Sequence, residues 1–466
     1  MDDRPLRAAL GRLGDTPQPP SAVDLDLARA QGRKRMRWRR AGLVAGPALA
    51  AALVTALAAA GVFGRIGTHG GLPSAHASKI KGILIGVSCP VPSRCVAVGE
   101  YYKPGPRYAL IEQWNGIRWA ISKGPVPPGP YRGDLYGISC VNAADCTAVG
   151  ASVGNPPQPT ATPIRDRALI EHWNGSAWTI MASPVLPASG SLGEISCTGP
   201  SRCIAVGMTG GGTAQRTRTL VERRNGSRWV IVPSPNPAGA AYSSLSSVSC
   251  TGPVNCMAVG EYFPGGQEQD RNHILVEHWN GSAWTITDAG PPPAGSLTSY
   301  LSAVSCTAES DCVAVGTASY PHRKGGSWGG SRERTLIEHW NGSAWSIIAS
   351  PDRAGPPADR LAGVACITAA DCTAVGSAAR RVPAGATDGG RTLIEHWNGS
   401  AWSVVSSPGS SANSGLSQVA CPATADCIAV GGFGGLDNPH GPQALIEHWN
   451  GSAWSIWPPP ARPASR

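Results

Sequence analysis

The stretch ALIEHWNGSAW at residues 444–454 decides the fold of this chain. Within residues 445–450 successive side chains fall into two alternating sets, which is the period of a β-strand with two different faces. Asn450-Gly451 follows, and this dipeptide is the strongest sequence signal for a two-residue hairpin turn of type I′. An apolar run resumes at Trp454. The stretch therefore predicts a strand, a tight turn and a second strand.

The same element occurs seven times, and a second predicted hairpin precedes each copy. The other copies lie at residues 110–119, 169–178, 220–229, 275–284, 336–345 and 393–402. The preceding hairpin is clearest in LSAVSCTAESDCVAVG at residues 301–316, so each repeat offers four short strands. Repeats with a period near 50 residues and four strands per unit indicate a β-propeller rather than a solenoid.

The predicted fold class is therefore all-β, a seven-bladed β-propeller of four-stranded blades, preceded by one transmembrane α-helix. The propeller is assigned to residues 80–460. The predicted blades cover residues 80–130, 131–188, 189–240, 241–296, 297–357, 358–412 and 413–460. We expect no strand exchange between the first and last blades, which would meet only through side-chain packing.

All fourteen cysteines belong to the repeats, in pairs six positions apart. Each pair flanks a predicted hairpin loop, where antiparallel partners approach closely enough for a disulfide. The predicted disulfides are Cys89–Cys95, Cys140–Cys146, Cys197–Cys203, Cys250–Cys256, Cys306–Cys312, Cys366–Cys372 and Cys421–Cys427. Zinc is the alternative, but two thiolates per blade leave a tetrahedral site two ligands short. No metal and no cofactor are expected.

The amino end predicts a membrane anchor. Residues 1–40 form a basic tail that is expected to be disordered, and residues 41–64 contain no charged side chain. A bilayer is spanned by about 20 apolar residues, and the basic cluster before the span places the amino end in the cytoplasm. The alternative is a cleaved signal peptide, whose apolar region is shorter, about 7–15 residues. Residues 65–79 would tether the propeller to the cell membrane on its extracytoplasmic side. Disulfides persist in that compartment. Residues 461–466 are expected to be disordered.

Charge argues against nucleic acid as a partner. The net charge is +9, and residues 1–40 hold much of this excess. The repeat region is close to neutral for its size and lacks the basic stripe of a nucleic-acid-binding surface.

Blade-to-blade variation predicts the binding face. The connection between the AVG and LIE strands varies from 10 to 19 residues, whereas the loop between the paired cysteines always has five residues. Loops on a rigid scaffold carry most binding residues. The candidate binding residues on this variable face are Tyr101, Tyr102, Arg107, Arg165, Arg167, Tyr262, Phe263, Tyr320, His322, Arg323, Trp328 and Arg332. Trp328 lies outside the repeated tryptophan positions; an incidental packing role is the alternative.

Two further patterns have structural interpretations. A glutamate recurs in all seven copies of the LIE strand, and catalysis needs one asymmetric constellation rather than seven copies. We therefore expect these glutamates to form hydrogen bonds with the neighbouring blade. In the third repeat Arg223-Arg224 replaces His-Trp, which indicates either a contact patch or a degenerate blade, and the degenerate blade is favoured.

The motif SCxxxxxCxAVG followed by LIExWNGxxW resembles those of secreted or membrane-anchored actinobacterial propeller-repeat proteins, most of them uncharacterised. Its WNGSAW turn is also similar to the kelch and Asp-box hairpins of other propellers, although Asn450 replaces the Asp-box aspartate. The resemblance implies the fold. It carries over no glycosidase activity, because no sialidase-like arginine triad and acid can be assigned.

The predicted function is a non-enzymatic binding scaffold for a protein or a cell-wall glycan. A second candidate is an envelope polysaccharide hydrolase or lyase, which would need carboxylates that converge on the variable face, such as Asp134, Asp166 or Asp270. A third candidate is a signalling sensor that uses the short cytoplasmic tail, and a fourth is a purely structural envelope protein.

Overall fold

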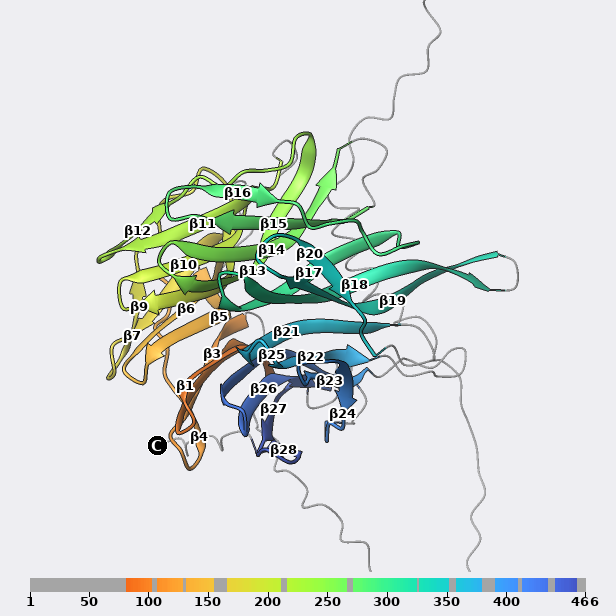
Figure 1. The fold of residues 1–466 in the computed structure, drawn as a ribbon. Helices are drawn as coiled ribbons and strands as arrows, with labels where there is room; N and C mark the ends of the chain where they lie inside the picture. Colours follow the sequence, from red (N-terminus) through yellow and green to blue (C-terminus); the bar gives the residue numbers. More distant parts are fainter. Residues whose placement is uncertain are drawn as a thin grey trace, which may run out of the picture. The chain divides into compact units, whose positions relative to one another are not determined.

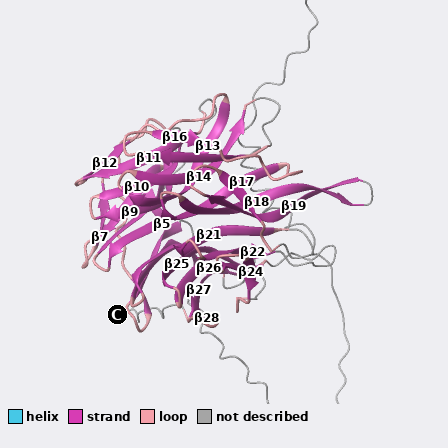
Figure 2. Ribbon diagram, in the orientation of Figure 1, coloured by secondary structure: helices cyan, strands magenta, loops and turns pink. Residues whose placement is uncertain are grey.

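The computed structural model describes residues 81–102, 107–128, 131–154, 166–210, 216–265, 271–324, 327–351, 358–378, 390–409, 413–434 and 441–458. These residues form seven antiparallel sheets of four strands each, in which sequence neighbours are hydrogen-bonded neighbours (Figures 1 and 2). The predicted all-β propeller with seven four-stranded blades is confirmed. No helix in this part of the chain is long and apolar enough to cross a membrane. The predicted span at residues 41–64, the tail, the tether and the residues 461–466 lie outside the described residues.

Each blade uses its strands in the same order, and the blades are numbered along the chain. The first strands are β1 (Lys81–Val91), β5 (Tyr131–Asn142), β9 (Gly190–Gly199), β13 (Ala240–Gly252), β17 (Thr298–Ala308), β21 (Asp359–Thr368) and β25 (Ser414–Ala423). The second strands are β2 (Arg94–Tyr102), β6 (Asp145–Gly154), β10 (Arg202–Thr209), β14 (Asn255–Pro264), β18 (Asp311–Lys324), β22 (Asp371–Ala378) and β26 (Asp426–Phe433).

The third strands carry the LIE motif, and the fourth strands are short. The third strands are β3 (Arg107–Trp114), β7 (Arg167–Trp173), β11 (Arg218–Asn225), β15 (His273–Trp279), β19 (Ser327–Trp340), β23 (Arg391–Trp397) and β27 (Gln443–Trp449). The fourth strands are β4 (Trp119–Ile121), β8 (Trp178–Met181), β12 (Arg228–Ile231), β16 (Trp284–Thr287), β20 (Trp345–Ile348), β24 (Trp402–Val405) and β28 (Trp454–Trp457).

The repeated glycine of AVG is required by a bulge in the first strand. In blade five the register shifts between Leu301 and Ala303, directly opposite Gly316. A Cβ on Gly316 would lie 2.0 Å from the carbonyl oxygen of Tyr300. This approach is closer than any side chain permits, so only glycine allows the first and second strands to pair at the bulge.

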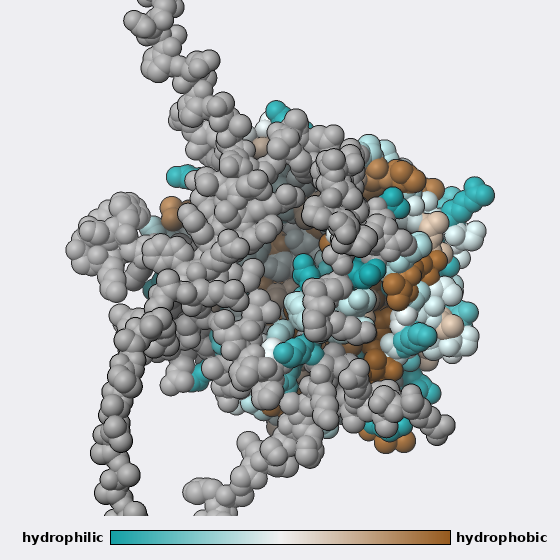
Figure 3. Space-filling model, turned by 180° about the vertical axis from the view of Figure 1, so that it is seen from behind, coloured by the Kyte–Doolittle hydropathy of each residue, from teal (hydrophilic) through white to brown (hydrophobic). Residues whose placement is uncertain are grey.

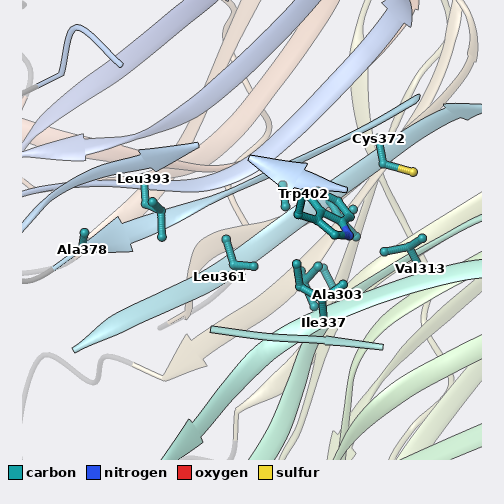
Figure 4. Packing of buried hydrophobic residues seen from close by; sticks show 11 residues of the cluster. Ala303, Val313, Ile337, Leu361, Cys372, Ala378, Leu393 and Trp402 are labelled. Atoms are coloured by element: carbon teal, nitrogen blue, oxygen red, sulfur yellow. The ribbon is translucent and has the colours of Figure 1, made fainter. Parts of the chain in front are cut away.

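The hydrophobic core lies between the blades. Figure 4 shows the cluster at the junction of blades five and six, where Ala303 and Ile337 face Leu361 and Trp402. Trp402 is only 6% exposed, and the second tryptophan of every other copy is buried in the same way. Seven such clusters join the seven pairs of adjacent blades. On the described part of the surface in Figure 3, apolar patches lie among polar side chains.

The ring closes with the same contacts that join neighbouring blades. Blade seven is completed by its own strands, as expected from the absence of strand exchange. The backbone N–H of Gly82 in blade one donates to the carbonyl oxygen of Pro442, before β27 of blade seven, at 2.8 Å. The N–H of Ser243 makes the equivalent bond to the carbonyl of Thr217 at 3.1 Å. The expectation that side chains alone close the ring was therefore wrong, because the first strand of blade one starts beside the chain that leads into β27.

The disulfides and turns occupy one end of the blades. All seven predicted disulfides are formed, and no cysteine is free. The predicted two-residue type I′ turn is wrong. Trp449 pairs with Trp454, so residues 450–453 form a four-residue loop in which Gly451 has a positive φ of 88°. The Asn450 Oδ1 atom accepts the N–H groups of Ser452 and Ala453 at 3.0 and 2.9 Å, which replaces the backbone pairing of a tighter turn.

Candidate functional site

The predicted binding residues lie at the end of the blades opposite the disulfides, where second strands finish and third strands begin. Tyr101 and Tyr102 end β2, Arg107 begins β3, and Arg167 begins β7. Tyr262 and Phe263 lie near the end of β14. Arg165 and Asp270 lie outside the described residues. These residues are spread over several blades, so the structure brings only some of them together.

The predicted long loop of blade five is a hairpin. β18 and β19 remain paired as far as Lys324 and Ser327, beyond the ends of their counterparts in the other blades (Figure 1). Tyr320 lies opposite Arg332, and Arg323 lies opposite Trp328. His322 also lies on this hairpin, and the side chains of His322, Arg323 and Trp328 are outside the described part of the structure. The sequence pattern did not predict this pairing, because Pro321 and the glycines around Trp328 mask the alternation of a strand.

A tyrosine–carboxylate–arginine cluster spans blades one and two. It comprises Glu100, Tyr102, Arg107 and Asp134, from β2, β3 and β5. Arg107 Nη1 donates to Glu100 Oε2 at 2.9 Å, and its Nε lies 3.7 Å from Asp134 Oδ2. The Tyr102 hydroxyl donates to Glu100 Oε1. One guanidinium group therefore bridges two carboxylates from neighbouring blades.

Burial shapes the electrostatics of this cluster. The Asp134 side chain is only 1% exposed, and neither of its oxygens accepts a hydrogen bond from a described residue. Burial raises the pKa of Asp134 to about 6, against the opposing effect of Arg107. Burial and Glu100 raise the pKa of Tyr102, and burial raises the pKa of neighbouring Tyr136 to about 12, so both phenols stay protonated. The Arg107 side chain is 50% exposed and presents the charge to solvent.

Tyr101 and Tyr108 form the pair next to Tyr102 and Arg107 in β2 and β3. The rings of Tyr101 and Tyr108 stack with centroids 5.3 Å apart, and the Arg132 guanidinium lies 5.6 Å from the Tyr108 ring centroid. The sequence pattern singled out Tyr101, Tyr102 and Arg107 but not Glu100. The available signal was its position directly after AVG, where only blades one and four carry a carboxylate, the latter at Glu261.

Other predicted residues form separate contacts. In blade four the Tyr262 ring stacks on His273 with centroids 5.2 Å apart, and Phe263 packs against Tyr242 at 4.9 Å. Asp166, one of the loop acids considered for catalysis, accepts the N–H of Gly154 at 3.3 Å. The cluster around Arg107 is thus the place where predicted residues from different strands, together with Asp134, converge.

The repeated glutamates are structural, as predicted. They are buried in every blade: Glu112, Glu171, Glu222, Glu277, Glu338, Glu395 and Glu447. In four blades a serine on the connection from the preceding blade donates to the carboxylate. The pairs are Ser183–Glu222 at 2.9 Å, Ser234–Glu277 at 2.8 Å, Ser350–Glu395 at 3.0 Å and Ser407–Glu447 at 2.8 Å. The predicted hydrogen bonding between neighbouring blades is thus confirmed for four of the seven glutamates.

The serine is missing before two of the described glutamates. Gly124 takes its place before Glu171, and Ala289 takes its place before Glu338. Both oxygens of Glu171 and of Glu338 lack a hydrogen-bond partner among the described residues. Burial raises the pKa of each carboxyl to about 8.

In blades two, five, six and seven the histidine after the glutamate also has a repeated partner, an aspartate. His172 lies 3.0 Å from Asp145, His339 lies 2.8 Å from Asp311, and His448 lies 2.9 Å from Asp426. Each aspartate stands directly before the second cysteine of its blade. The His–Asp pair therefore joins the third strand to the start of the second strand, next to the disulfide. Among the described residues, no three His, Cys, Asp or Glu side chains gather closely enough to hold a metal ion.

No protein-family model and no curated protein matches this chain. Solved structures resemble its fold. An ulvan lyase, a polysaccharide lyase, matches with a TM-score of 0.50 and 11% identity over 82% of this chain and 97% of the other. A xyloglucanase from Xanthomonas campestris matches with a TM-score of 0.48 and 13% identity over 82% of this chain and 55% of the other. A YCF48 protein bound to a D1 peptide matches with a TM-score of 0.46 and 13% identity over 80% of this chain and 95% of the other. Similarity at this level concerns the propeller fold, which both enzymes and binding proteins share.

Proposed function

We propose that this protein is a membrane-anchored, extracytoplasmic binding scaffold whose variable face takes a protein or a cell-wall glycan. The observation that carries the proposal is the half-exposed guanidinium group of Arg107, held by Glu100 and Asp134 at the end of the blades that also carries Tyr101 and Tyr108. Arginine and tyrosine dominate binding hot spots, because both bury a large area and keep directional polar groups.

The two carboxylates serve to position Arg107. Glu100 and Asp134 are buried beneath the guanidinium group, which is itself half-exposed. Two charge-paired contacts from different strands hold this long side chain in one place, so a ligand would bind it with little further loss of side-chain entropy. A buried carboxylate beneath an arginine is poorly placed to reach a substrate.

The location belongs to the proposal as well. It rests on the uncharged residues 41–64, on the basic cluster before them and on the seven disulfides, which persist in oxidising compartments. The resemblance of the repeats to those of actinobacterial envelope proteins supports the same location.

A hydrolase or lyase that acts on envelope polysaccharide is the second candidate. It is favoured by the convergence of Glu100 and Asp134 on one arginine next to Tyr102 and Tyr136. The two candidates differ in one outcome, because an enzyme cleaves its ligand whereas a scaffold releases it intact.

The test is a binding screen of the full-length protein in detergent against envelope glycans and envelope protein extracts. The variant Arg107→Ala removes the presented charge, and Arg94→Ala, exposed at the disulfide end of the same blade, is the matched control. A second variant, Trp328→Ala with Arg323→Ala, probes the blade-five hairpin. We expect saturable binding that Arg107→Ala weakens and Arg94→Ala leaves unchanged. Binding unaffected both by Arg107→Ala and by the variant with Trp328→Ala and Arg323→Ala would refute the assignment to the variable face.

Product analysis separates scaffold from enzyme. Each bound glycan is incubated with the protein and assayed for new reducing ends and for unsaturated sugar products. Intact glycan supports the scaffold. Cleavage that is lost in both Glu100→Gln and Asp134→Asn would establish the enzyme instead.

A further inference from the structure

Blade three carries arginine at three positions that lie close together, and blade one shares only the first of them, as Arg94. Blades two, five, six and seven carry Asp directly before the second cysteine and His-Trp at the end of the third strand. In blade three these positions are Arg202, Arg223 and Arg224. A paired His and Asp and an indole ring are thus replaced by three guanidinium groups.

The rest of blade three keeps the architecture of its neighbours. Trp229 is buried, and Glu222 accepts the hydroxyl of Ser183 from the preceding blade. The disulfide Cys197–Cys203 is formed. Besides the arginines, blade three differs in its turn, where Asn225 pairs with Arg228 and only two residues close the hairpin. Its buried tryptophan, inter-blade hydrogen bond and disulfide are kept, which argues against the degenerate blade favoured from the sequence.

The arginines line a pocket of about 360 Å³ at the disulfide end of blades three and four. The Arg223 guanidinium lies 5.6 Å from the ring centroid of Trp279 in blade four. Arg224 Nε donates to the carbonyl oxygen of Gly226 at 3.1 Å. Both side chains are therefore held in place before any ligand binds.

The arginines that line the pocket have no carboxylate partner among the residues of its wall. Arg223 Nε and Arg224 Nη1 are buried and have no hydrogen-bond partner in the described structure. No Asp or Glu is among the residues that line the pocket. A carboxylate that enters the pocket would lie among three guanidinium groups with no carboxylate of the protein in competition, which favours its binding.

The remaining walls suit a sugar ring. Pro253 and the Cys250–Cys256 disulfide provide apolar surface, and Thr198 and Ser201 provide hydroxyl groups. The volume exceeds what one oxyanion needs and lies at the lower end of the range for small-molecule sites, about 300–1,000 Å³. An acidic monosaccharide unit would fill it, with its carboxylate on the arginines and its ring against the apolar wall.

We propose that this pocket is a second binding site, which recognises the carboxylate of a uronic acid. Planar guanidinium forks match a carboxylate in bidentate geometry. The site lies at the end of the blades opposite Arg107, so it stands independently of the function proposed for the variable face.

The test measures binding of sodium glucuronate, glucose and sodium sulfate to the full-length protein in detergent by titration calorimetry. The triple variant Arg202→Asp, Arg223→His and Arg224→Trp gives blade three the residues that four other blades already carry, so it is expected to fold. Arg228→Gln removes a nearby exposed arginine that does not line the pocket and is the matched control.

We expect glucuronate to bind at least about tenfold more tightly than glucose, with an affinity that falls as salt rises. The triple variant should lose this preference, and Arg228→Gln should keep it. Undetectable glucuronate binding, or equal binding by the triple variant, would overturn the proposal. Sulfate binding tighter than glucuronate binding would overturn the sugar assignment. If Arg107→Ala weakens binding to envelope material and leaves the affinity for glucuronate unchanged, the two sites are independent.

Discussion

Glu338 should make the stability of the propeller decrease as pH rises. Its side chain is fully buried, both oxygens lack a partner among the described residues, and burial raises its pKa from 4.5 to about 8. The folded protein therefore holds a proton that the unfolded chain releases above about pH 4.5. The stabilising effect is fully present below that pH and is lost as pH rises towards 8. For one such group the loss is about 1.4 kcal/mol per pH unit.

The variant Glu338→Gln removes this dependence, because an amide of the same shape does not ionise. The free energy of unfolding would be measured by urea titration at pH 5, 6, 7 and 8 with the disulfides intact. The other buried glutamates contribute equally to both proteins, so the difference between the two curves isolates Glu338. We expect the variant to gain about 1.4 kcal/mol relative to the wild type for each pH unit in this window.

Glu309→Gln is the control, since its exposed side chain lies in the same blade. Its curve should run parallel to that of the wild type. Parallel curves for Glu338→Gln as well would refute the reasoning, since they would show that the Glu338 carboxyl has the same pKa in the folded and the unfolded protein.

Ala289→Ser should supply the hydroxyl that Glu338 lacks and stabilise the fold by about 1 kcal/mol, measured by urea unfolding at pH 7; no gain would contradict the assigned role of the serines. Ala420 stands directly before the first cysteine of blade seven. In five other blades this residue is a serine, whose hydroxyl oxygen accepts the N–H of the first cysteine in the next blade at 3.0–3.1 Å. Ala420→Ser should therefore stabilise the junction of blades seven and one by a similar amount. Gly316→Ala should destabilise the fold by more than about 3 kcal/mol, since its Cβ would lie 2.0 Å from a carbonyl oxygen; a smaller loss would show that the bulge can relax. Reduction of one disulfide should lower the free energy of unfolding by about 2 kcal/mol, as expected for a closed loop of this size. The fall in melting temperature on adding reductant measures the combined effect of all seven disulfides.

The blade architecture was accessible from the sequence because its determinants are local. The period of 2 through residues 445–450, the cysteine spacing and the repeat length are all properties of short segments, and they predict strands, disulfides and blade number. The turn after Trp449 was mispredicted for a different reason. The two indole rings pack against each other with centroids 5.9 Å apart, which fixes the pair that closes the loop. That contact overrides the preference of Asn-Gly for a two-residue turn.

The candidate site was only partly accessible, because it depends on contacts between blades. Arg107 and Asp134 were each noted from the sequence, but their approach depends on how β3 packs beside β5. Glu100 was missed because it follows AVG in the register of a buried strand. The sequence could not show that Arg107 would sit between two carboxylates.

Departures from a repeat carry different meanings, and the hydrogen-bonding state of the polar groups separates them. Replacing the serine before Glu338 with Ala289 removes a hydroxyl and leaves a carboxyl that takes up a proton instead, so the departure adds nothing a ligand could use. Arg223 and Arg224 add charges that cannot be neutralised by losing a proton, since guanidinium stays ionised. Arg223 Nε and Arg224 Nη1 have no acceptor among the described residues, and both side chains line a pocket without a carboxylate in its wall. A departure that adds permanent charge next to a cavity is therefore a stronger sign of binding than one that removes a hydrogen bond.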